Sequence, residues 1–165
     1  MRNLSIAIIL RILLIISLAL HILTSVKSAQ LSEMLRNKEI SYDFYMENDI
    51  NTTYYTIPFL ILVLLNTWFA NFSSKKRNNG RILMKEIVIP EMNLEDDERE
   101  SVITGNSAKA ALSVIIVATF VMLVSFPLAT TLFDDVITYS VFTIAALPII
   151  GLLTYFITYK MLYSR

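Results

Sequence analysis

The stretch "VITYSVFTIAALPIIGLLTYFITY", residues 136–159, decides the fold class, because it is a long apolar run without a charged side chain. A helix of about 20 residues crosses a hydrocarbon core of roughly 30 Å. Three similar runs precede it, at residues 4–26, 54–72 and 110–129. None shows the period-2 alternation of barrel strands. The sequence predicts an all-α integral membrane protein with four transmembrane helices, forming a single membrane domain over residues 1–165.

The overall composition agrees with this class and excludes several others. The chain has 165 residues, of which 55% are hydrophobic, and its mean hydropathy is +0.59. The 14 basic and 14 acidic side chains cancel, so bulk charge gives no reason to expect nucleic-acid binding. The absence of cysteine excludes disulfides, thiol catalysis and cysteine-ligated metals.

The orientation follows from the basic residues near the ends of the spans, which collect on the cytoplasmic side. The segment 73–109 is rich in them: Lys75, Lys76, Arg77, Arg81 and Lys85 follow the second span, and Lys109 lies just before the third. The turn between the last two spans contains two acidic residues, Asp134 and Asp135, and no basic residue. We therefore expect a cytoplasmic loop at 73–109, an external loop at 27–53 and both termini in the cytoplasm. Lys75, Lys76 and Arg77 are expected to anchor to lipid headgroups together with Trp68, which fits an interfacial aromatic belt.

The N-terminal segment allows a second interpretation. Arg2, the apolar stretch 12–20 and the small-residue site "VKSA" at 26–29 resemble a signal peptide, and cleavage would leave three spans. The apolar region continues on both sides of Arg11, which favours an uncleaved span. In the external loop, the segment 32–48 has enough apolar and aromatic residues to form a short helix on the outer surface.

A few polar residues lie within the predicted spans. Arg11 either extends to the headgroups or meets a buried partner, such as an acidic residue of another subunit. Asn66 and Asn71 are candidates for hydrogen bonds to a neighbouring helix or for lining a path. Pro127 and Pro148 are expected to kink the last two spans.

The cytoplasmic loop contains an acidic run, Glu95, Asp96, Asp97 and Glu98, followed by small residues. The acids fit the first turn of a helix that continues into the third span, because they complement its positive end. Docking of a basic partner and a weak metal site are the alternatives. Gly105, Ala108 and Ala111 would let another helix approach closely.

The segment "LEDDERESVITGNSAKAALSVII", residues 94–116, resembles small multi-spanning prokaryotic membrane proteins of unknown function, in which an acidic D-E-R run precedes a membrane helix. The resemblance implies a bacterial or archaeal cell membrane and carries over no functional residue.

The arrangement of reactive residue types favours a binding role over catalysis. The one histidine, His21, lies near a span end, and the spans contain no acidic residue. We therefore expect neither an enzyme nor a cofactor. The leading hypothesis is an accessory or regulatory subunit of a larger membrane complex, with the lipid bilayer and a membrane protein as partners. The alternative is a small channel or transporter built as a homo-oligomer, lined by Asn66, Asn71, Thr119 and Ser125.

Overall fold

The computed structural model describes residues 2–77, 98–132 and 135–164, and their regular elements are all helices. In chain order these are α1 (Arg2–Arg36), α2 (Tyr42–Asn48), α3 (Thr53–Arg77), α5 (Glu98–Leu132) and α6 (Val136–Tyr163). Four segments of the described residues are long and apolar enough to cross a membrane, and each contains most of one long helix: Leu4–Arg36, Tyr42–Phe72, Arg99–Phe126 and Val136–Tyr163. The predicted all-helical class with four apolar helices is thus confirmed.

The long helices extend beyond the predicted spans. α1 has 35 residues and continues ten residues past Val26, while α5 begins at Glu98, twelve residues before Ala110. The apolar run records only the length that crosses the hydrocarbon core, and a helix can continue into water if its polar residues favour helix. The segment 27–53 therefore contains the end of α1 and the whole of α2, so that residues 42–48 of the expected segment 32–48 form a short helix and residues 32–36 belong to α1. In α6 the helix runs without interruption through Pro148.

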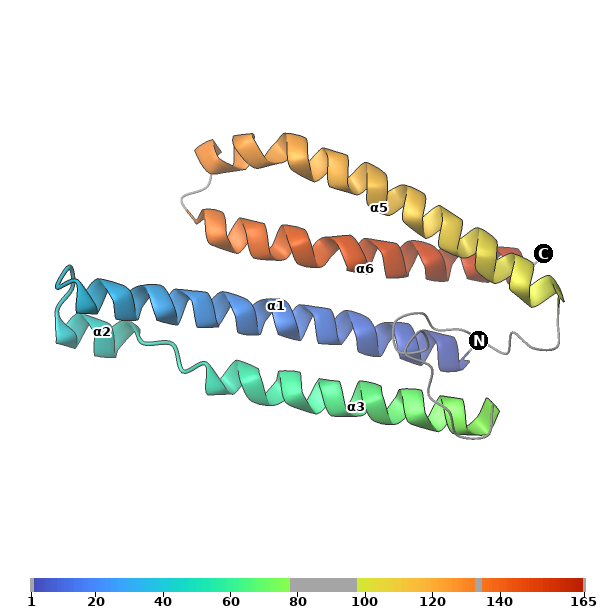
Figure 1. The fold of residues 1–165 in the computed structure, drawn as a ribbon, viewed down its shortest axis with the longest axis horizontal. Coiled ribbons are helices and arrows are strands. Elements are labelled where there is room, and N and C mark those ends of the chain that lie inside the picture. Colours follow the sequence, from blue (N-terminus) through green and yellow to red (C-terminus); the bar gives the residue numbers. More distant parts are fainter. Residues whose placement is uncertain (1, 78–97, 133–134, 165) are drawn as a thin grey trace.

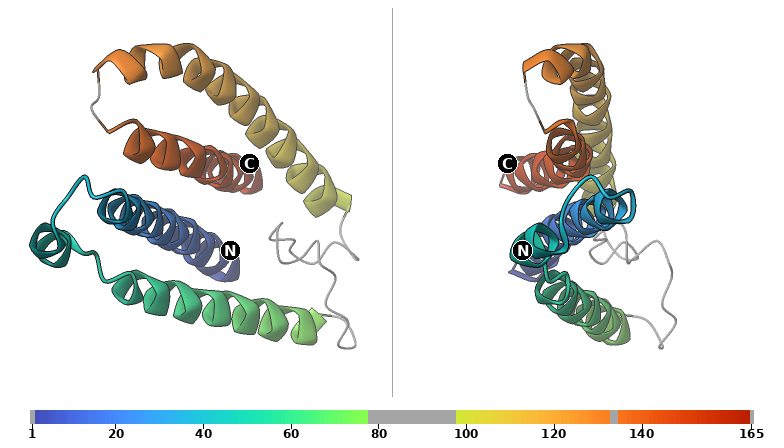
Figure 2. Two further views of the ribbon diagram at one scale, coloured as in Figure 1. Left: turned by 60° about the vertical axis from the view of Figure 1, so that its left-hand side comes forward. Right: turned by 90° about the vertical axis from the view of Figure 1, so that its left-hand side faces the viewer.

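The four long helices form an open row in the order α3, α1, α6, α5 (Figures 1 and 2). Contacts between them join α3 to α1, α1 to α6, and α6 to α5, while the described parts of α3 touch neither α5 nor α6. Neighbours in the row are antiparallel. Both chain termini lie at the same end of the helix axes, which is the end where α5 begins (Figure 1). We call this the terminal end, and the opposite one the hairpin end.

The buried core lies at the terminal end, where α1, α5 and α6 converge. Its side chains are Leu4 and Ile8 of α1, Ile103 and Ala111 of α5, and Tyr155 and Tyr159 of α6. Elsewhere large apolar side chains are exposed along all four helices, as at Ile9, Leu64, Val124 and Ile144. Such an exposed apolar surface is expected where lipid tails, and not water, surround a helix.

Helices α5 and α6 approach each other closely at Gly151 of α6. A methyl group built on this glycine would lie 2.5 Å from Cδ1 of Ile115 on α5. The missing side chain therefore lets α5 pack directly against the backbone of α6. α5 curves along its length (Figure 2).

Candidate functional site

A polar cluster lies inside the core at the terminal end. Arg11 of α1 is half-buried, its Nη1 is enclosed, and its guanidinium interacts electrostatically with Tyr155 of α6. Helical side chains lean toward the N-terminus of their helix, which for α1 is the terminal end. Arg11 therefore points toward the near boundary of its span and meets a side chain of its own molecule there.

The second part of this cluster joins α5 to α6. The hydroxyl of Tyr159, which is 2% exposed, donates a hydrogen bond of 3.0 Å to Oε1 of Glu100. Tyr159 also stacks on Tyr155 and Tyr163, with ring centroids 6.1 and 6.0 Å apart. The spacing of four residues places the three rings on one face of α6. The first turn of α5 is thus fastened to α6 by a carboxylate.

The seam between α1 and α3 holds two polar contacts. The Asn66 amide donates to the carbonyl of Leu10 at 3.1 Å and to that of Leu62, in its own helix, at 2.9 Å. Farther along, Nδ1 of His21 lies 3.2 Å from the hydroxyl of Thr56. The His21 ring also stacks on Phe59. Asn66 and His21 therefore both face the neighbouring helix.

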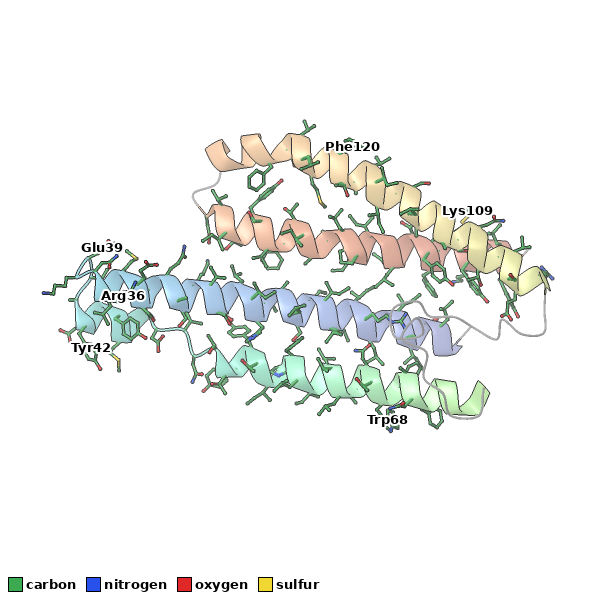
Figure 3. All side chains as sticks on the ribbon, in the orientation of Figure 1. Arg36, Glu39, Tyr42, Trp68, Lys109 and Phe120 are labelled. Carbon is green, nitrogen blue, oxygen red and sulfur yellow. The ribbon has the colours of Figure 1, made fainter. Side chains whose placement is uncertain are left out.

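Trp68 points away from the other helices, on the outer side of α3 (Figure 3). Trp68 is 64% exposed and stacks on Phe72, and Asn71 is exposed beside them. The backbone at Lys75, Lys76 and Arg77 is the last turn of α3. The four residues proposed for a path do not converge within one copy: Asn66 and Asn71 lie on α3, whereas Thr119 and Ser125 lie on α5, at the other edge of the row.

On α5 the small residues divide between two faces. Ala111 and the fully buried Ser107 face the core, whereas Gly105 and Ala108 are exposed, with nothing within 4 Å of a methyl group built on Gly105. Glu98 begins the helix, in keeping with the helix expected to start in this segment. Glu95, Asp96 and Asp97 lie outside the described residues. Within the described residues no group of three His, Asp or Glu side chains could hold a metal ion.

A salt bridge fastens the hairpin end. Nζ of Lys27 on α1 lies 2.6 Å from Oδ2 of Asp135, which caps α6 by accepting hydrogen bonds from the backbone N–H and the hydroxyl of Thr138. The Lys27 ammonium, together with Thr138, lowers the pKa of the Asp135 carboxyl well below its usual range. This pair joins α1 to α6 at the end opposite the buried core.

Sequence reasoning did not anticipate the Tyr159–Glu100 and Lys27–Asp135 contacts, because their partners are 59 and 108 residues apart. The tyrosines at 155, 159 and 163 offered one signal, since their spacing places them on one helix face. Comparison with known proteins found no matching family model, curated protein or solved structure.

Proposed function

We propose that this chain is a non-enzymatic accessory or regulatory subunit of a larger membrane complex, such as a transporter, a secretion system or an immunity-type system. The observation that supports this proposal is the open row of helices. Among the described residues, the edge helices α3 and α5 each pack along one neighbour, α1 and α6 respectively, and α5 shares a buried core with α1 only at the terminal end, so both keep most of their surface for other molecules. A layer with two broad faces and two edges is suited to packing laterally against another membrane protein.

The polar contacts support a binding role in a second way. Ser125 pairs with the hydroxyl of Tyr139, Thr119 bonds to the carbonyl of Ile115, and Asn66 bonds across to α1. Ser125 and Asn66 thus join neighbouring helices, whereas the Thr119 hydroxyl is satisfied within α5, so three of the four side chains of the proposed path already have hydrogen-bond partners. A path would require several copies, with α3 of one beside α5 of the next.

We further propose that the protein is a multi-pass protein of a bacterial or archaeal cell membrane, with the terminal end in the cytoplasm. The basic segment at the end of α3 supports this orientation by the positive-inside rule. The chain contains no cysteine, so a maleimide can react only with a cysteine that is introduced. Single cysteines in place of Ser164 and Ser41 would show on which side of the membrane the terminal end and the hairpin end lie. In intact cells an impermeant maleimide should label position 41 and leave position 164 unlabelled. The reverse pattern would contradict the orientation.

The proposed function is tested by purifying the chromosomally tagged full-length protein in mild detergent, followed by mass spectrometry and mass photometry of the intact assembly. A defined complex with a second membrane protein in fixed stoichiometry is the expected result. A homo-oligomer alone, together with solute flux in liposomes containing only this protein, would favour the channel or transporter. A monomer without a stoichiometric partner would overturn the proposal.

A further inference from the structure

We propose that the last turns of α1 together with α2, residues 28–50, form a docking surface for a basic extramembrane segment of the partner. We call these residues the distal lobe. The inference rests on the proposed function and deepens it, because it places the partner's contact outside the bilayer and states its chemistry.

The distal lobe lies beyond the apolar spans and therefore outside the lipid tails. Lys27 and Asp135 are charged and paired, and they mark one boundary of the apolar spans. Arg36 lies nine residues beyond Lys27, which corresponds to about 14 Å of helix. The end of α1 and the whole of α2 project past the neighbouring ends of α5 and α6 (Figure 1). Apolar side chains here are not covered by hydrocarbon.

In the distal lobe, hydrogen bonds cap the C-terminus of α1 and the N-terminus of α2. α1 ends with the N–H of Glu39 bonded to the carbonyl of Met34 and the N–H of Lys38 bonded to that of Leu35. Lys38 has a positive φ of 62°, as this C-terminal motif requires. Ser41 then caps α2 by accepting from the N–H of Phe44 at 3.2 Å, and α2 packs against α1. The side chains of α2 are therefore presented in a fixed geometry.

One face of α2 exposes large apolar groups. Tyr42 and Met46 are one helical turn apart and are 63% and 59% exposed, with the half-buried Tyr45 between them on the same face, while Phe44 on the opposite face is 48% exposed. Aromatic residues and methionine are enriched at the centres of protein interfaces, and methionine adapts to irregular partners. Outside the hydrocarbon, such a face gains stability by covering itself with another protein.

The charge around this face selects the partner. The distal lobe has five acidic side chains against two basic ones, and Arg36 already lies 3.6 Å from Glu33. The acids are Glu33, Glu39, Asp43, Glu47 and Asp49. Carboxylates are repelled by lipid phosphates, which argues against the membrane surface as the occupant. A basic protein surface complements them and gains in association rate and specificity.

The test uses the full-length protein in its own membrane, with a photoreactive phenylalanine derivative at single positions. The derivative replaces Met46 to probe the proposed face of α2, and Phe44 to probe the opposite face. At Leu64 it probes the exposed edge of α3. Position 46 should cross-link to the protein that co-purifies in fixed stoichiometry, with position 44 giving much less product. The variant D43K/E47K should recover at least tenfold less partner, whereas K38E, a charge reversal of the opposite sign in the same lobe, should not. Unchanged thermal unfolding of both variants shows that the fold is intact.

The remaining outcomes separate this inference from the proposed function. If the complex is recovered but cross-links form only from Leu64, or D43K/E47K retains its partner, the accessory role stands and the distal lobe is not the docking surface. Cross-links from Met46 to lipid or to a second copy of the chain would also overturn the inference. If no stoichiometric partner is recovered at all, the proposed function fails and the docking surface fails with it.

Discussion

Hydroxyl side chains on the apolar helices mostly bond to carbonyls of their own helix. Thr67 donates to Val63, Ser107 to Ile103 and Thr119 to Ile115, each four residues back. These bonds satisfy a polar group in an apolar setting but carry no information about neighbouring helices. The few polar contacts between helices, such as Asn66 with Leu10, therefore fix how the helices meet.

Replacement of Asn66 by leucine tests this distinction. N66L removes the bond to the Leu10 carbonyl, so the free energy of unfolding should fall by about 0.5–1.5 kcal/mol, the usual range for interhelical hydrogen bonds in membranes. The control is T67V, which removes a hydroxyl bonded only to its own helix and should change stability much less. Reversible unfolding in mixed micelles measures both. Equal effects of the two variants would show that the Asn66 contact does not join α1 to α3.

The pairing of Asp135 with Lys27 predicts a specific pH dependence. Because the pKa of Asp135 is lowered in the folded protein, the salt bridge is complete above the ordinary value of about 4 and is lost only as pH falls through the lowered value. The NMR resonance of the Asp135 carboxyl carbon should therefore show no titration step between pH 7 and about 4. K27M should move the titration back toward the ordinary range, whereas K38M should not. A midpoint at or above 4 in the unaltered protein would contradict the salt bridge.

At the scale of elements, the sequence predicted that the helices exist and where their apolar lengths lie. It could not predict their ends, because segments such as 27–36 and 98–109 are polar and still favour helix. Likewise, Gly105 and Ala111 belong to one small-residue pattern, yet they face open space and the core respectively. A composition of small residues indicates that close approach is possible and does not say which residue is used.

The contact between α5 and α6 should depend on Gly151. G151L would push against Ile115 and separate the two helices, which should cost about 1–3 kcal/mol of stability. The matched control is G105L on α5, where nothing lies within 4 Å and the substitution also improves helix propensity. Thermal unfolding in detergent should show a lower midpoint for G151L and an equal or higher one for G105L. If both variants unfold alike, the tight packing at Gly151 does not exist.

At the scale of the whole molecule, the order of helices could not be read from the sequence. Each long helix is apolar around most of its circumference, so no stripe identifies the side that meets a neighbour. The contacts that set the order join residues far apart in the chain, as Lys27 and Asp135 or Glu100 and Tyr159 do. The open row, and not any reactive group, is the feature that supports a role in binding other membrane proteins.

The most direct test of this account is the distance between the two edge helices in a lipid bilayer. Because the chain lacks cysteine, spin labels can be placed at Leu64 of α3 and Leu112 of α5, both of which are exposed, and measured by pulsed electron paramagnetic resonance in nanodiscs. Three interhelical spacings of about 8–10 Å predict axes about 25–30 Å apart. A distance near 10 Å would mean that α3 packs on α5 in a closed bundle, which would contradict the open row and the lateral binding role built on it.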